Sequence, residues 1–199
     1  AYSRSTEMRK KLTESMFEEF MVPRLSINSG GVCSLYSIGK VTGFILDLSH
    51  GCSTTTAVFD GFHIKNAGIK SKIGGIDITQ YLMDLITVSE AWSFIGECKH
   101  SFFELSSSIK EETSLTTLNP NQKFECSVKH DTGKFQLPDC RILNLNDAQT
   151  HVGDLYFDPT LSKRCSTAEF KSLPDLIRDS ISLCDESLRS KLLNDFYVI

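Results

Sequence analysis

The chain has 199 residues, and 40% of them are hydrophobic, which is enough to bury a core. Its formal net charge of −4 comes from interspersed acidic and basic residues, so no basic stripe exists that would neutralise a phosphate backbone. The longest apolar runs are too short to cross a bilayer. We therefore expect a globular chain that contacts neither nucleic acid nor membrane directly.

The seven cysteines are odd in number, irregularly spaced and free of CxxC pairs, and no hydrophobic signal segment precedes them. This pattern predicts reduced cytosolic or nuclear thiols that pack as small apolar groups. The five histidines lie far apart in the sequence, so no metal site is expected.

The first forty residues predict a helix, a strand and a break. Residues 8–20 form an amphipathic pattern that needs a partner surface. Leu25 and Ile27 alternate with polar neighbours, which predicts a short strand. Ser29-Gly30-Gly31 then opens an apolar segment that ends at Tyr36. The apolar stripe of the first helix consists of Leu12, Met16, Phe17 and Phe20.

Two β-branched, apolar segments follow, at residues 42–48 and 53–59. They predict two strands that pair as a hairpin across a turn at His50-Gly51. Gly74-Gly75 breaks the pattern, and Asp77 with Gln80 three residues later predicts a helix start with Asp77 as its cap. That helix carries Ile78, Tyr81, Leu82, Leu85 and Ile86 at helical spacing.

The second half of the chain is more broken. We predict a helix at 99–111, a loop and hairpin region at 116–133 around a strand-like 124–128, and a strand at 141–145. Asp158-Pro159 marks a turn. Further on, Ser172 caps a helix with Pro174 and Asp175 in its first turn, and a shorter helix and an apolar strand at 196–199 follow. An apolar strand at a terminus is unusual, so the sequence predicts a piece of a longer polypeptide.

Three phrases resemble the actin family. Residues 16–20 read MFEEF before Pro23, as in the family's MFE-x-F…P segment. Residues 34–43 read SLYSIGKVTG, which resembles SLYASG-x-TTG and runs into a strand ending in aspartate. Residues 74–83, GGIDITQYLM, resemble the AGRDLTDYLM helix start. Residues 109–111 and 137–139 match the family's IKE and LPD phrases, and the shared order is more specific than any single motif.

The resemblance implies a fold: an α/β, actin-like ATPase (ribonuclease H-like) fold, a mixed sheet with flanking helices, truncated at both ends. Residues 1–37 would be the last helix and strand of the first lobe plus the connecting helix. Residues 38–73 and 166–199 would be the sheet subdomain of the second lobe, and residues 74–165 its inserted helical and hairpin subdomain.

By the same resemblance, the turn after residue 47 would hold the phosphates of ATP through its backbone amides. Asp47 and Gly51 are kept there, followed by Cys52. His50 stands in place of the family's second aspartate, near the water shell of the metal. Ser49 replaces a glycine, and its Cβ narrows the approach of a phosphate.

Two further replacements bear on hydrolysis. The family histidine that helps order the attacking water is Thr54 here, and the glutamine that positions this water aligns with Gly30. Losing both orienting groups predicts little hydrolysis, because phosphoryl transfer depends on positioning and electrostatics. On the nucleoside side, the resemblance implies contacts from Gly75, Lys110 and Glu111.

Without the resemblance, these residues have ordinary structural interpretations that need no ligand. Asp47 at a strand end is often a turn former. Lys110 and Glu111 are as often solvated helix residues as ligands. His50 is better read as a polar turn residue than as a general base, since no partner carboxylate can be named.

Two functions follow from the resemblance. The preferred one is a divergent actin-related protein that acts as a structural or scaffolding subunit of a cytoskeletal or chromatin-associated complex, with a degenerate site for ATP or ADP with Mg. The alternative is an ATP-hydrolysing, filament-forming protein. Expected partners are actin or other protein subunits, and a second copy through the exposed first helix. The expected location is the cytoplasm, in the cytoskeleton, or the nucleus.

Overall fold

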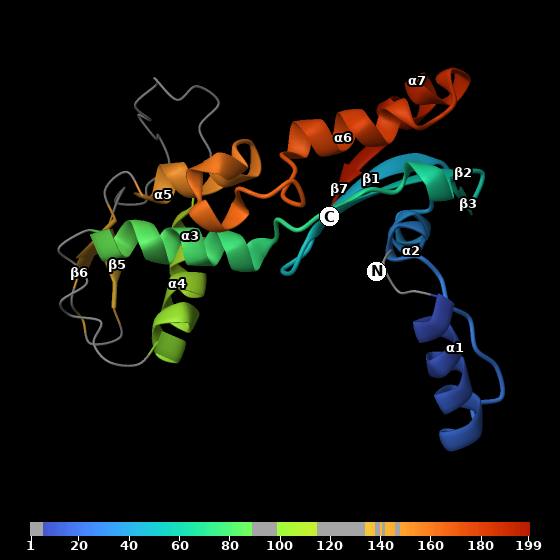
Figure 1. Cartoon of the computed structure of the whole chain (residues 1–199), viewed down its shortest axis with the longest axis horizontal. Coiled ribbons are helices and arrows are strands. Elements are labelled where there is room, and N and C mark those ends of the chain that lie inside the picture. Colours follow the sequence, from blue (N-terminus) through green and yellow to red (C-terminus); the bar gives the residue numbers. More distant parts are fainter. Residues whose placement is uncertain (1–5, 89–98, 115–133, 138–139, 141, 146–147) are drawn as a thin grey trace. The chain divides into compact units, whose positions relative to one another are not determined.

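The computed structural model describes residues 6–88, 99–114, 134–137, 140, 142–145 and 148–199 (Figure 1). The predicted hairpin region at 116–133, with its strand-like 124–128, lies outside the described residues. The chain divides into two compact units. Unit 1 comprises Ala1–Ser49, Ser53–Lys70 and Asp175–Ile199, and unit 2 comprises His50–Cys52 and Ser71–Pro174. The assignment of residue ranges to the family's lobes stays a prediction.

Unit 1 is built on a mixed sheet in the order β3-β2-β1-β7. β1 (Gly43–Leu48) pairs antiparallel with β2 (Ser53–Phe59), as the sequence predicts, and β7 (Phe196–Val198) pairs parallel with β1. β3 (Phe62–His63) and β4 (Lys70–Ser71) both pair with β2. The carbonyl of Ile199 accepts the Leu48 N–H at 2.7 Å, so the final residues are held in the sheet.

Alternating side chains of β1 reach two cores. Phe44, on one face, packs with residues that include Cys184 and Leu192 from the segment of α6 (Leu173–Ser182) and α7 (Glu186–Asn194). Ile45, on the other face, packs with α2 (Gly30–Ser37). Helices therefore cover both faces of the sheet, and Figure 1 shows α2 on the opposite side from α6 and α7. This is the mixed α/β arrangement that the sequence predicts.

The first segment confirms one prediction and corrects another. The helix predicted at 8–20 is present as α1 (Thr6–Glu14), which widens into a π-helical turn, η1 (Ser15–Glu19). The strand predicted at Leu25 and Ile27 is wrong, because residues 21–29 form no strand. Alternation alone does not make a strand, and this segment pairs with no strand among the described residues.

Unit 2 is mainly helical. α3 (Gly75–Val88) packs against α4 (Lys99–Thr113), and Leu82, Ile86 and Ile109 lie in their shared core. A two-stranded sheet, β5 (Lys134–Gln136) and β6 (Ile142–Asn144), contributes Leu143 to the same core. Short helical turns then follow: α5 (Ala148–His151), η4 (Val152–Tyr156), η5 (Pro159–Leu161) and η6 (Lys163–Cys165).

The start of α3 corrects the predicted cap. The helix begins at Gly75, two residues before Asp77, so Asp77 lies in its first turn instead of preceding it. The Asp77 carboxylate accepts a hydrogen bond from the Gly74 N–H at 2.9 Å, and the Gly74 carbonyl accepts from Asp77 and Ile78. Asp77 therefore plays the reciprocal part of a capping box, which the sequence pattern alone assigned one turn too late.

Along the described part of the chain, no helix combines the length and the apolar character that a membrane span requires.

Candidate nucleotide-binding turn

The first half of the candidate phosphate turn belongs to unit 1. Asp47 is near the end of β1, where its register partner on β2 is Thr54. The exposed Ser49 donates a hydrogen bond from its hydroxyl to Asp47 Oδ1 at 2.5 Å. The Asp47 carboxylate therefore already has a donor from the residue that stands in place of the family's glycine.

The tip of the turn, His50–Cys52, belongs to unit 2 and is bonded to the start of α3. The His50 carbonyl accepts a hydrogen bond from the Ile76 N–H at 2.8 Å. A Cβ placed on Gly74 would lie 2.5 Å from both the Cys52 nitrogen and the His50 carbonyl oxygen. Only glycine fits at this approach, so the missing side chain of Gly74 is what lets the helix start contact the turn.

The turn presents backbone donors. Among the described residues, no backbone carbonyl accepts a hydrogen bond from the N–H of His50, Gly51 or Cys52. His50 and Gly51 are exposed and Cys52 is half-buried. Free N–H groups fixed in a turn provide positive dipoles for an anion. Binding of a phosphate by this tip stays a prediction.

A lysine completes the group within unit 2. Lys110, on α4, donates from Nζ to the Thr79 hydroxyl at 2.9 Å and to the Gly75 carbonyl at 3.2 Å. A Cβ on Gly75 would lie 3.4 Å from His50 Cα and 3.6 Å from Lys110 Nζ. The structure thus brings together His50, Gly75 and Lys110 of the predicted site. Glu111 is exposed, and its carboxylate accepts from Ser107 at 3.3 Å.

Sequence reasoning missed Thr79 and the close approach of Gly74. Thr79 is fully buried and donates to the Gly75 carbonyl at 2.9 Å while it accepts from Lys110. One signal could have identified it: a hydroxyl four residues after Gly75 lies on the same helical face. Apart from the glycine pair itself, nothing in the sequence indicated that Gly74 lies against the turn His50–Cys52.

Burial, with the Asp77 carboxylate as the second cause, shifts the ionisation of two groups in unit 2. Burial, followed by the negative charge of Asp77, raises the pKa of the Tyr156 phenol and the pKa of the Cys165 thiol. Both groups are therefore held in their neutral forms. No cluster of three or more His, Cys, Asp or Glu side chains suited to a metal ion occurs within the described ranges.

The positions that would orient an attacking water lie in unit 1. Gly30 opens α2, and a Cβ built on it would meet no atom within 4 Å. Thr54 is 7% exposed and lies in β2. Neither residue carries a side chain that can hold a water at the distance that glutamine or histidine reaches.

The chain matches the actin family over residues 1–95 and 98–199. It therefore belongs to the actin family. It is also similar to a Dictyostelium discoideum protein described as "Putative actin-29", with 28% identity over 193 residues, or 95% of this chain. The chain spans about half, 48%, of the length of that relative.

Proposed function

We propose that this chain is the core of a divergent actin-related protein that works through protein contacts and keeps a degenerate nucleotide site. The turn would bind the phosphates of ATP or ADP with Mg weakly, and hydrolysis would be slow. The residues proposed for the phosphates are Asp47, Ser49, His50, Gly51 and Cys52, and those for the nucleoside are Gly75, Lys110 and Glu111.

The observation that carries this proposal is the bond between Ser49 and Asp47. The Ser49 hydroxyl lies 2.5 Å from the carboxylate of Asp47, the acidic residue that the proposed phosphate turn retains. A carboxylate that already accepts an internal hydrogen bond is less available to a hydrated cation, and the Ser49 side chain occupies space that a glycine leaves open. Both effects weaken binding of Mg with a nucleotide.

Two other residues support slow hydrolysis. Gly30 leaves an open position where the family has a glutamine, and Thr54 replaces a histidine. Loss of one preorganised group typically lowers a rate by about a hundredfold or more, so losing two leaves little activity. A protein of this kind would serve as a scaffold subunit in a cytoskeletal or chromatin-associated complex, in the cytoplasm or the nucleus, with actin or other subunits as partners.

One observation favours the alternative, an ATP-hydrolysing filament former: the Lys110 side chain, proposed to contact the nucleoside, is already fixed by hydrogen bonds. Lys110 is held by Thr79 and by the Gly75 carbonyl before any ligand binds, so this half of the site needs no rearrangement. Sedimentation of polymer in Mg-ATP separates the two functions. A scaffold subunit stays in the supernatant, and a filament former pellets in a concentration-dependent way.

Calorimetric titration of the 199-residue chain with Mg-ATP tests the proposed site directly. We expect no heat of binding at micromolar ligand. Ser49→Gly, which removes the hydroxyl from Asp47, should increase affinity, and Ser37→Gly is a matched control at an exposed serine in α2. Micromolar binding by the unchanged chain would contradict the proposal.

A further inference from the structure

Two segments separated by about a hundred residues meet in unit 2 at one buried hydroxyl. Ser71 is fully buried, and its side chain bonds to the main chain of Lys171 in both directions. Its Oγ donates to the Lys171 carbonyl at 2.9 Å and accepts from the Lys171 N–H at 2.9 Å. The same oxygen lies 3.4 Å from the Ile73 N–H. A single side chain thus makes the pair of hydrogen bonds that a neighbouring backbone would make in a β-ladder.

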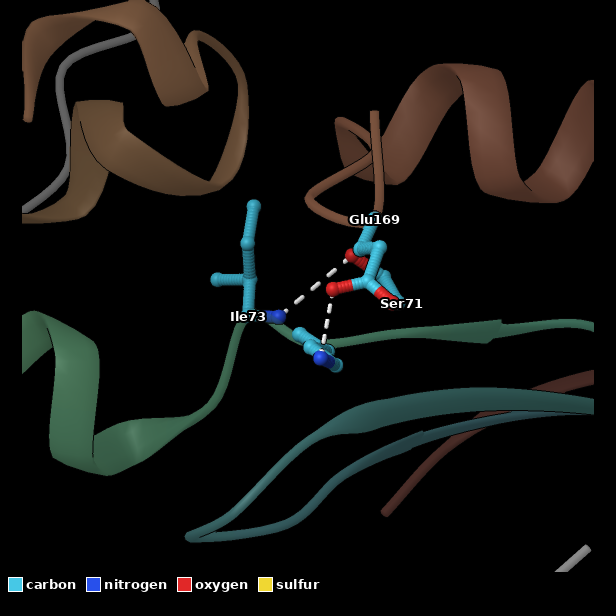
Figure 2. Close-up of polar contacts among 4 residues, drawn as sticks. Ser71, Ile73 and Glu169 are labelled. Carbon is cyan, nitrogen blue, oxygen red and sulfur yellow. Dashed lines mark hydrogen bonds and ion pairs between the residues drawn. The ribbon is translucent and has the colours of Figure 1, made fainter. Parts of the chain in front are cut away.

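The neighbouring residues add a second attachment. The Lys72 N–H donates to the Glu169 carbonyl at 3.0 Å, and Lys72 Nζ lies 2.5 Å from Glu169 Oε2. Figure 2 shows the labelled Ser71, Ile73 and Glu169 around this junction. Both side chains of the ion pair are more than half exposed, so water and salt screen it. The buried Ser71 hydroxyl, not the ion pair, is therefore the specific part of the junction.

This junction leads directly into the candidate turn. Ile73 precedes Gly74, whose backbone lies against the Cys52 nitrogen and the His50 carbonyl. Two residues beyond Gly74, the Ile76 N–H donates to that same carbonyl at 2.8 Å. The backbone from Ser71 to Ile76 is therefore fixed at one end by Lys171 and at the other by the turn. Because this short segment is held at both ends, we expect a shift at Ser71 to move Ile76 as well.

We propose that Ser71 is a positioning residue, which holds the backbone of Gly74 and Ile76 against the turn His50–Cys52 by anchoring it to the Lys171 segment. The predicted effect of Ser71 on the position of the turn does not depend on nucleotide binding. An effect of Ser71 on nucleotide affinity rests on the proposed function, since the turn is the part that would hold the phosphates.

Amide hydrogen exchange at Ile76 measures the bond between helix and turn without any ligand. Ser71→Ala should speed exchange at Ile76 by about tenfold or more, because the N–H and the carbonyl of Lys171 lose their hydrogen bonds to the Ser71 hydroxyl. The Asp158 amide, bonded to the Asp154 carbonyl in the same unit, should keep its rate. Ser71→Thr, which retains the hydroxyl, should restore protection at Ile76.

Two controls separate this role from simple destabilisation. Ser180→Ala removes another fully buried serine, whose hydroxyl donates to the Ala67 carbonyl in unit 1, and should leave Ile76 unchanged. Lys72→Ala removes only the exposed ion pair and should also leave it unchanged. Equal acceleration at Ile76 and Asp158 in Ser71→Ala, or no acceleration at Ile76, would overturn the proposal. Micromolar binding of Mg-ATP by the unchanged chain would refute the proposed function without affecting this result.

Discussion

At the scale of single residues, His63 is the group whose environment most directly links stability to pH. It lies half-buried in β3, opposite Val58, and burial followed by the charge of Lys65 lowers its pKa below the ordinary value of 6.5. The folded state therefore disfavours the protonated imidazole. The stability that this gives is present above pH 6.5 and is lost as the pH falls through the lower, folded-state pKa.

We expect the free energy of unfolding, from urea melts between pH 7.5 and pH 5, to fall less steeply in His63→Gln than in the unchanged chain. The difference in the free energy of unfolding between the two proteins should grow as the pH falls below about 6.5. His151→Gln, at an exposed histidine, is the matched control because it leaves His63 in place. Parallel curves for His63→Gln and the unchanged chain would show that His63 does not contribute.

Particular residues show how much of the candidate site the sequence could predict. The turn at His50-Gly51 and the presence of a helix after Gly74 were predictable, because glycine pairs and β-branched runs act locally, but the cap of that helix was placed about one turn too late. The bond from Ser49 to Asp47 and the bridge from Lys110 to Thr79 were not. Both depend on side-chain rotamers that only the folded backbone selects.

At the scale of elements, α2 lies close to the sheet because of Gly31. A Cβ on Gly31 would meet three side-chain atoms of Thr56 at 2.7 to 2.8 Å. Thr56 is 3% exposed and β-branched, so it has little freedom to move away. Gly30, the preceding residue on the same helix, has open space at its Cβ position. Gly30 is therefore a matched control for a substitution at Gly31.

Gly31→Ala should destabilise the chain by about 1–3 kcal/mol, since it overpacks a buried contact. Gly30→Ala should be neutral or stabilise the chain by up to about 1 kcal/mol through helix propensity. Denaturant melts of both variants give the comparison. Equal stability of the two would mean that α2 does not pack on β2 at this distance.

Most elements could be predicted from periodicity, and the exceptions have local causes. Strands β1 and β2 and helices α3, α4, α6 and α7 appear where β-branched runs or helical spacing place them. The strand expected at Leu25 and Ile27 is absent, because pairing depends on a neighbour that local sequence does not specify. The junction of Ser71 with Lys171 was beyond prediction, because it joins residues a hundred positions apart.

At the scale of the whole molecule, the N-terminal helical segment carries apolar side chains that face solvent. No residue of α1 or η1 is buried. Phe17 and Phe20 are 45% and 69% exposed. Burying such a side chain fully contributes about 1.5–3 kcal/mol, so this surface favours association. The other strongly exposed apolar side chains of this segment are Met8 and Met21.

We expect the 199-residue chain to self-associate through this surface, with a mass that rises with concentration in light scattering. Phe17→Lys combined with Phe20→Lys should return it to a monomer. Glu18→Lys, which reverses a charge on the same turn and removes no apolar surface, should associate like the unchanged chain or more strongly. A monomer at every concentration, with an ordered α1, would show that this surface needs no partner.

We propose that this member of the actin family hydrolyses ATP slowly, because Gly30 and Thr54 stand where the resemblance implies side chains that orient water. Phosphate release from Mg-ATP by the longest polypeptide that contains this chain tests it, in the unchanged form and with Gly30→Gln, Thr54→His and Ser49→Gly combined. We expect negligible phosphate release by the unchanged protein and an increase of about a hundredfold in the combined variant. Release by the unchanged protein at the rate of conventional actin, with no gain in the variant, would contradict it.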